Sequence, residues 1–424
     1  MTCASPPPGV IWVIARADAA TLLSGESVKA FSSIGSAAGD EMAQRTVRVI
    51  MNGVTGRMGY RQHLLRSLLA IRDDGGVVLP DGDRLQVEPV LVGRNAEKLA
   101  GLAAQHGLAD VTTDLDEALA DDSASIYFDA QVTSERKKSI LKAISAGKHV
   151  YTEKPIAESV AEGIELVTAA RDAGVINGVV HDKLYLPGFL KLKRLIDAGF
   201  FGRIISVRGE FGYWVFEGDL VPAQRPSWNY RAEDGGGIIL DMFPHWNYVL
   251  ENLFGRVRAV SARAVTHIPE RWDEQGRRYD ATADDAAYAI FELEGDVIAQ
   301  VNSSWAVRVD RGELVEFQVD GTHGSAVAGL FGCRVQPRVE TPMPVWNPDL
   351  PTTEDFRGQW HEVPDLVEFG NGFRAQWEQF LTDVDAGRPH AYDLAAGVRG
   401  LRLAEAGLES STSGRRVPIE EQAS

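Results

Sequence analysis

The sequence predicts an α/β fold class with two domains: an N-terminal Rossmann domain on a doubly wound parallel sheet, and a C-terminal α/β domain with a large, mostly antiparallel open sheet. Strand-like and helix-like segments alternate as far as about residue 180, which is typical of a doubly wound sheet. After Pro187, long strand-like segments follow one another across short breaks such as Glu294-Gly295-Asp296. A chain of 424 residues fits two domains, which we place at 46–180 and 181–424.

The first domain opens with a buried strand at 46–52, which ends in a glycine turn. The helix after the turn carries an apolar face, made of Leu64, Leu65, Leu68, Leu69 and Ile71. Further strands are expected at 87–92, 126–130, 149–152 and 175–180, and further helices at 96–106, 134–146 and 158–173.

The second domain begins with a helix at 188–198. Its expected strands lie at 204–215, 257–267, 286–293, 297–305 and 313–319. A helix at 238–254 interrupts them, and two more at 373–386 and 394–411 close the chain. Residues 330–365 are rich in Pro and Trp, so we expect an irregular segment there.

Composition excludes several kinds of protein. The formal net charge of −17 repels phosphate backbones, so we expect no nucleic-acid partner. No apolar run reaches the roughly 20 residues of a membrane span, so we expect no membrane partner. The two cysteines, Cys3 and Cys333, form no CxxC pair, and no metal site is expected. This composition suits a cytoplasmic enzyme, and residues 1–45 are expected to be a disordered extension or the product of a start upstream of Met42.

The glycine turn predicts a dinucleotide site. Gly53, Gly56 and Gly59 follow a strand and open a helix, which allows a tight turn, close approach of a pyrophosphate and close helix packing. The free N–H groups of the helix start then face the anion. Thr55, Arg57 and Met58 belong to the same turn and are expected to contact the cofactor.

The second strand predicts which nucleotide binds. NAD enzymes usually have an acid at the end of that strand, and none stands in Leu91-Val92-Gly93-Arg94-Asn95. Arg94 is placed to meet a 2′-phosphate, so we expect NAD(P) with a preference for NADP. The alternative for Arg94 is a solvated residue that caps the next helix.

Three residues have the chemistry of alcohol oxidation, in which a base must take the hydroxyl proton. His245 is the expected base, and Asp241, four residues earlier on one helix, is expected to orient it. Lys154 follows a strand at the carboxyl edge of the parallel sheet, where ligands gather, and is expected to polarise the substrate oxygen. Glu153 and Lys154 are also expected to lie against the cofactor. An ordinary surface pair is the alternative for Asp241 and His245.

Other polar and aromatic residues are candidates for substrate contact. Aromatic faces with polar neighbours suit sugar rings, and the segment 211–231 offers Tyr213, Trp228 and Arg231. His181, Asp182 and Lys183 end the last strand near the domain junction and are further candidates, of which His181 and Lys183 are expected to contact the substrate; the alternative for this segment is a plain structural hinge. A core or subunit-interface cluster is the alternative for the aromatic residues.

Together these features resemble the glucose–fructose oxidoreductase / inositol dehydrogenase (Gfo/Idh/MocA) family over about residues 46–418. The most specific marks are the glycine turn, Glu153-Lys154-Pro155, the end of the 187–202 helix, and Gly235-Gly236-Gly237 with Asp241 and His245. The resemblance implies an oxidoreductase acting on a sugar or cyclitol, a homodimer or homotetramer, a pocket lysine at Lys154 and a proton acceptor at His245. The sequence departs from the family at His181-Asp182-Lys183, where Asn and then Arg are common.

Two other functions fit the same features. One is a non-catalytic nucleotide-binding sensor or regulatory protein on the same fold. The other is an enzyme that oxidises and re-reduces within one turnover.

Overall fold

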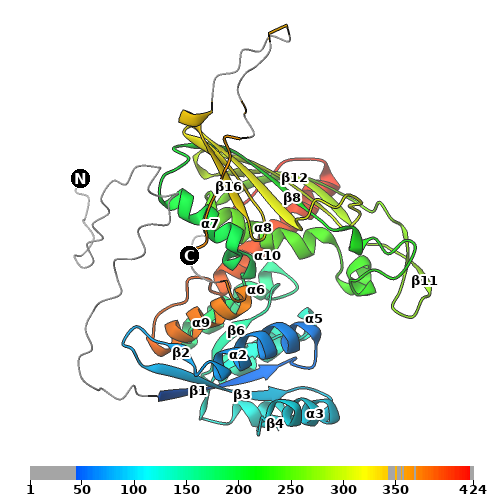
Figure 1. The fold of residues 1–424 in the computed structure, drawn as a ribbon. Coiled ribbons are helices and arrows are strands. Elements are labelled where there is room, and N and C mark those ends of the chain that lie inside the picture. Colours follow the sequence, from blue (N-terminus) through cyan, green and yellow to red (C-terminus); the bar gives the residue numbers. More distant parts are fainter. Residues whose placement is uncertain (1–43, 342–348, 351–354, 356–357, 367–368, 421–424) are drawn as a thin grey trace, which may run out of the picture.

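The structure is a computed structural model that describes residues 44–341, 349–350, 355, 358–366 and 369–420. The expected N-terminal extension lies outside the described residues, apart from Gln44 and Arg45 at the start of the first strand. The two large sheets with their helices lie one above the other (Figure 1). A third sheet among the described residues has only two strands, β10 (Glu270–Trp272) and β11 (Arg278–Asp280). Among the described residues, no helix is both long and apolar enough to span a bilayer.

The smaller sheet is the predicted Rossmann sheet. Its strand order is β2-β3-β1-β5-β6-β7, with β4 beside β3, and all neighbours are parallel except β2 and β3. The strand order reverses at β1 and β5, which is where doubly wound sheets bind ligands. The strands are β1 (Gln44–Asn52), β2 (Val77–Val78), β3 (Arg84–Val92), β4 (Val111–Thr112), β5 (Ala124–Asp129), β6 (His149–Thr152) and β7 (Asn177–Val179).

Helices cover both faces of this sheet. The expected helix after the glycine turn is a π-helix, and its wider turn leaves Leu65 exposed while Leu64 and Leu68 are buried. The prediction that Leu65 shares the apolar face was therefore wrong. The helices are η2 (Gly59–Leu69), α2 (Ala70–Asp73), α3 (Ala96–His106), α4 (Leu115–Leu119), α5 (Thr133–Ser145) and α6 (Val160–Ala173).

The larger sheet is mostly antiparallel, as predicted, with only β8 and β13 running parallel among its described neighbours. Its order is β17-β16-β15-β14-β8-β13-β12-β9-β18. The expected irregular segment at 330–365 was partly wrong, because β16 and β17 lie in it. The strands are β8 (Ile204–Phe211), β9 (Val257–Val265), β12 (Ala286–Leu293), β13 (Ile298–Ser304), β14 (Val315–Gly321), β15 (Gly324–Ala328), β16 (Cys333–Pro337), β17 (His361–Glu362) and β18 (Val417–Pro418).

Helices pack on one face of the larger sheet. The helices α7 (Pro187–Asp197), α8 (Ile238–Leu253) and α10 (Leu394–Ser413) lie between the two sheets (Figure 1). The other face carries exposed apolar side chains, including Tyr288 and Ile290 on β12.

The last part of the chain returns to the Rossmann sheet. Helix α9 (Gly372–Asp385) packs on η2, and Trp377, Phe380 and Leu381 join the core of the first sheet (Figure 1). The core of the cofactor domain is therefore completed by residues beyond the boundary expected at 180.

Helix α8 starts in the glycine triplet that the sequence singled out. Gly235 and Gly237 have positive φ angles of 76° and 126°, and a Cβ on Gly236 would lie 2.5 Å from the carbonyl oxygens of Trp228 and Asn229. The Asp284 carboxylate accepts from the Ile239 N–H at 2.9 Å, which caps the helix start. The glycines thus fix the direction in which α8 enters the domain junction.

Candidate active site

The glycine turn forms a close-packed cradle at the switch point of the Rossmann sheet. Gly53 has a φ of 81°, and a Cβ there would lie 2.6 Å from the Ala130 carbonyl carbon; a Cβ on Gly59 would lie 2.6 Å from the Gly53 oxygen. Gly56 is exposed and has only the Gly53 oxygen within 4 Å of such a Cβ. Gly53 thus allows the tight turn, Gly59 lets the helix pack closely on the strand, and Gly56 leaves room for a dinucleotide pyrophosphate to approach the backbone. Thr55, Arg57 and Met58 complete this turn at the helix start.

Arg94 lies just beyond β3, in the loop before α3, with its side chain exposed. The next residue, Asn95, caps α3 by accepting from the Lys98 N–H at 2.9 Å. The capping role considered as an alternative for Arg94 therefore belongs to Asn95.

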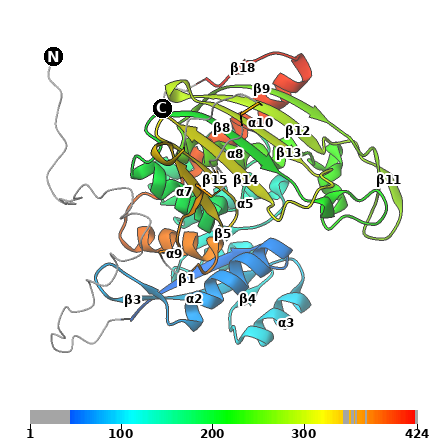
Figure 2. The same ribbon diagram turned by 45° about the horizontal axis from the view of Figure 1, so that its top comes forward.

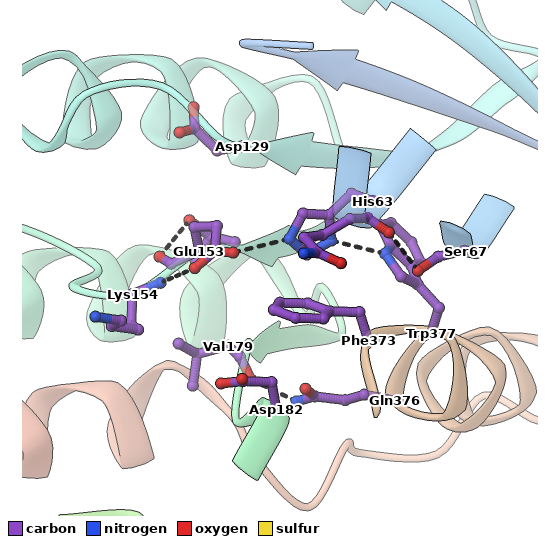
Figure 3. A network of polar contacts seen from close by, with 12 residues as sticks. His63, Ser67, Asp129, Glu153, Lys154, Val179, Asp182, Phe373, Gln376 and Trp377 are labelled. Atoms are coloured by element: carbon purple, nitrogen blue, oxygen red, sulfur yellow. Dashed lines mark hydrogen bonds and ion pairs between the residues drawn. The ribbon is translucent and has the colours of Figure 1, made fainter. Parts of the chain in front are cut away.

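Glu153 and Lys154 leave β6 in opposite directions. The Glu153 side chain points into the domain, where its Oε1 lies 2.8 Å from His63 Nε2 and its Oε2 accepts from the Lys154 N–H at 3.1 Å (Figure 3). The Glu153 carboxylate is therefore paired with a buried imidazole, and its expected contact with the cofactor stays a prediction. Burial alone would raise the pKa of Glu153, but His63 and Lys154 hold that pKa below its usual value.

His63 is held from its other side by the C-terminal helix α9. The Trp377 N–H donates to His63 Nδ1 at 3.0 Å, so Nε2 carries the proton that the Glu153 carboxylate accepts. Figure 3 shows Glu153 between Lys154 and His63, with Trp377 behind. This buried chain fixes the backbone from which Lys154 projects.

Lys154 meets Asp241 at the junction of the two domains. Its Nζ lies 2.7 Å from Asp241 Oδ1, and Arg225 Nη2 lies 2.7 Å from Asp241 Oδ2. Burial would raise the pKa of Asp241, yet the charges of Lys154 and Arg225 hold it well below its usual range. Arg225 is itself stacked on the Trp305 ring at 4.3 Å. The carboxylate thus holds the ammonium group of Lys154 in place.

His245 has other partners than the sequence predicted. Its Nδ1 lies 2.6 Å from Tyr248 Oη, and Lys183 Nζ lies 3.3 Å from each ring nitrogen. The expected orientation of His245 by Asp241 was wrong, because both Asp241 oxygens face cations. Burial and the charges of Lys154 and Lys183 lower the pKa of His245 well below its usual value, so the imidazole is neutral at pH 7. A neutral imidazole is the form that accepts a proton.

The other substrate candidates divide into two groups. Lys183 lies in the site, whereas His181 is buried behind it, stacked on the Tyr248 ring at 4.1 Å. His181 therefore supports Tyr248 from behind, and its contact with the substrate stays a prediction.

Farther along the chain, Trp228 is half exposed and Tyr213 partly buried. The Arg231 guanidinium lies over the Tyr279 ring at 4.4 Å and is 3.7 Å from Asp234. Tyr279 and Asp234, the two partners of Arg231, do not belong to the cluster of Lys154, Asp241 and His245.

Sequence reasoning missed the contacts of four residues in this arrangement. Arg225 stood among the aromatic residues without a partner, and Tyr248 lies three residues after His245 on the same helical face. Asp182 was considered only with His181 and Lys183 as a candidate for the pocket, and His63 was assigned no role. The helical spacing was a usable signal for Tyr248, but nothing in the chain indicated the partners of Arg225 or His63.

Among the residues that the structure describes, no group of three or more His, Cys, Asp or Glu side chains is placed to hold a metal.

Comparison with known proteins identifies the family. A family model for oxidoreductases with an NAD-binding Rossmann fold matches residues 47–181, and one for the GFO/IDH/MocA C-terminal domain matches residues 189–327. The chain belongs to the GFO/IDH/MocA oxidoreductase family. The resemblance inferred from the motifs, the fold class and the prediction of an oxidoreductase acting on CH–OH groups are thereby confirmed.

Several members of this family are similar over much of the chain. A D-xylose dehydrogenase of Paenarthrobacter nicotinovorans is 62% identical over 379 residues, which is 88% of this chain and 98% of that protein. A levoglucosan dehydrogenase of Pseudarthrobacter phenanthrenivorans is 24% identical over 257 residues, 57% of this chain and 65% of that protein. A solved structure of a levoglucosan dehydrogenase with NADH and levoglucosan has a TM-score of 0.73 at 22% identity, over 89% of this chain and 100% of that one. The structural likeness shows the shared fold.

Proposed function

We propose that this GFO/IDH/MocA oxidoreductase is an NAD(P)-dependent sugar dehydrogenase whose substrate is D-xylose or a closely similar aldose. The observation that carries the proposal is the cluster of Lys154, Asp241 and His245 at the carboxyl edge of the Rossmann sheet. The substrate class follows from the D-xylose dehydrogenase that is 62% identical over 98% of its length.

Each residue of the cluster has a role that its environment supports. When bound, the nicotinamide supplies the hydride acceptor. Lys154 donates a hydrogen bond to the substrate oxygen and stabilises negative charge that develops there, while Asp241 and Arg225 hold it in place. His245 takes the hydroxyl proton, because burial and two nearby lysines keep it neutral until it does so.

We place the reacting hydroxyl on C1 of the sugar ring. The ring oxygen donates electron density to C1 as the hydride leaves, so this carbon is the easiest of the ring to oxidise. The product is then a lactone, which NMR of the reaction mixture distinguishes from a keto-sugar.

The proposed cofactor preference is NADP, and it rests on Arg94. An exposed guanidinium beyond β3, with no acid after that strand, suits a 2′-phosphate better than ribose hydroxyls. We predict that Arg94→Ala lowers kcat/KM for NADP about tenfold, the loss of one charged hydrogen bond, and leaves that for NAD nearly unchanged. An equal loss with both nucleotides, or none with either, contradicts the preference.

The function is tested by following reduced-nicotinamide absorbance with a panel of aldoses. His245→Gln is expected to lower kcat about 10²- to 10⁴-fold while leaving cofactor affinity intact. The exposed His267 offers a control, since His267→Gln leaves both unchanged. Loss of turnover and cofactor affinity together in His245→Gln counts against a role as base.

The same assay separates the competing functions. Cofactor binding without reduction by any sugar favours a sensor or regulatory protein. Tightly held cofactor with sugar conversion but no net reduction favours an enzyme that re-reduces its product in the same turnover.

A further inference from the structure

The geometry around His245 identifies which of its nitrogens carries the proton. Tyr248 Oη lies 2.6 Å from His245 Nδ1, donates to Asp182 Oδ1 at 3.2 Å and accepts from the Lys183 N–H at 3.4 Å. Tyr248 is buried, and its ring is stacked on His181 at 4.1 Å, so the hydroxyl position is fixed.

The hydrogen bonds of the Tyr248 hydroxyl determine which nitrogen of the neutral His245 ring carries the proton. A phenol donates one hydrogen bond and accepts two. The Asp182 carboxylate only accepts and the Lys183 N–H only donates, so the remaining bond to His245 must be accepted by Oη. The neutral imidazole therefore carries its proton on Nδ1, which leaves the lone pair on Nε2.

The Asp182 carboxylate, and not Lys183, decides between the two tautomers. Lys183 Nζ lies 3.3 Å from both ring nitrogens of His245 and therefore favours neither. In the reverse tautomer, the Tyr248 hydroxyl would donate to His245. Its oxygen would then lie 3.2 Å from Asp182 Oδ1 with no proton between the two oxygens.

We propose that Tyr248 and Asp182 are the positioning residues of the general base His245. They hold its proton on Nδ1, direct Nε2 at the substrate hydroxyl, and place the Asp182 charge where it stabilises the imidazolium formed during turnover. The proposal rests on the proposed function, since it assigns His245 as base, and it gives the orienting role expected of Asp241 to a different carboxylate.

Several charged groups face His245 and contribute to its titration. Lys154 projects from the end of β6, Asp182 and Lys183 from η3 (Asp182–Tyr185), and Asp241 from α8 itself. Tyr248 itself and His181, packed behind it, are further titratable neighbours. Among these groups, Asp182 is the one joined to His245 through a hydroxyl, with its carboxylate 3.9 Å from Nδ1.

The test compares Tyr248→Phe and Asp182→Asn with Tyr392→Phe as a control. Tyr392 contacts the same His181 ring, with 5.2 Å between the ring centroids, but does not hydrogen-bond to His245. We expect both test variants to lower kcat about tenfold to a hundredfold with KM little changed, and the control to match the wild type. Phe keeps the ring stack on His181, so loss of packing does not explain the effect.

Two readouts separate orientation from a merely structural role. Asp182→Asn removes a negative charge near the imidazolium, so the acid limb of kcat/KM moves about one unit to lower pH. In ¹⁵N NMR of the protein without substrate, His245, assigned through His245→Gln, shows the Nδ1–H tautomer in the wild type and a mixture in Tyr248→Phe.

The outcomes distinguish this proposal from the proposed function. Suppose that turnover depends on His245, but that the acid limb of the kcat/KM profile stays in place in Asp182→Asn and the His245 tautomer is unchanged in Tyr248→Phe. This result overturns the positioning roles of Tyr248 and Asp182 and leaves the proposed function intact. Full turnover in His245→Gln overturns the proposed function, whatever the tautomer. If Tyr248→Phe does not fold, Asp182→Asn decides by itself, since Asp182 is partly exposed and Asn keeps its shape.

Discussion

At the scale of single residues, the candidate active site depends on carboxylates that each have two donors. Asp241 holds Lys154 and Arg225, and Glu153 holds His63 and the Lys154 N–H. A partly or fully buried carboxylate with two donors stays ionised and keeps both donors in place. Lys154 is therefore fixed at both ends, by Glu153 at its backbone and by Asp241 at its ammonium group.

The pKa of Glu153 leads to a prediction about stability. The pKa of Glu153 is lowered in the folded state, so the ionised side chain contributes to the free energy of unfolding. This contribution is fully present above the usual pKa of about 4.3 and is lost as the pH falls through the lowered pKa of the folded state. Glu153→Gln removes the charge and leaves one donor unpaired, so we predict a loss of about 1–3 kcal/mol at pH 7 and a smaller difference near pH 3.5. Urea unfolding at both pH values measures the two differences.

The exposed Glu409, on the surface of α10, provides the matched control. Glu409→Gln is expected to leave the free energy of unfolding unchanged at both pH values. Equal losses for Glu153→Gln at pH 7 and pH 3.5 would show that the charge of Glu153 does not stabilise the fold.

The sequence predicted which residues meet, but not how they pair. Lys154, Asp241 and His245 were found from the strand end and the helix spacing, which are local features. The pairing of Arg225 with Asp241 depends on how a loop folds back over α8, and the pairing of His63 with Trp377 joins segments 314 positions apart. No local pattern encodes contacts of that kind.

At the scale of elements, two glycines allow α10 to approach the helix that carries His245. A Cβ on Gly407 would lie 2.4 Å from the Phe243 ring, and one on Gly400 would lie 3.2 Å from Pro244 Cα. The position of α8, and with it that of His245, therefore depends on small residues of α10.

This packing predicts opposite effects for the same substitution in two helices. Gly407→Ala adds a methyl group into the Phe243 ring, so we expect unfolding free energy to fall by about 1–3 kcal/mol despite the better helix propensity of alanine. Gly101→Ala, in α3 with nothing within 4 Å, is expected to raise it by about 0.5–1 kcal/mol. Chemical denaturation of both variants decides, and a stabilising Gly407→Ala would contradict close α8–α10 packing.

Most elements were predicted within one or two residues, and the failures have physical causes. The alternating apolar residues of β12 and the capping glycines of the Rossmann helices are strong local signals. Strand β15 is five residues long with glycine at its start, and β16 lies in a proline-rich segment, so both lack such a signal. Their strand conformation depends on hydrogen bonds to β14 and to each other.

At the scale of the whole molecule, the outer face of the larger sheet predicts self-association. Tyr288, Ile290 and Ile298 are each more than 40% exposed on β12 and β13, and Figure 2 shows α8 behind these strands. We predict a homodimer or homotetramer formed through this face. Ile290→Glu is expected to shift light-scattering mass toward the monomer.

A second exposed apolar residue tests whether this face is specific. Val339 lies beyond β16 and is 92% exposed, so Val339→Glu is expected to leave the assembly unchanged. A monomeric wild type at micromolar concentration, or equal effects of the two substitutions, contradicts association through β12 and β13.

The return of α9 to the first sheet has a consequence for how the protein is made. Trp377, Phe380 and Leu381 fill the core beside η2, and Trp377 holds the histidine that supports Lys154. Chains emerge from the ribosome N-terminus first, and domains usually fold as they emerge. Here the nucleotide-binding half must wait for a segment that follows the second domain's strands in the chain, so nascent chains that stop short of Gly372 present an unfinished apolar surface to chaperones and proteases.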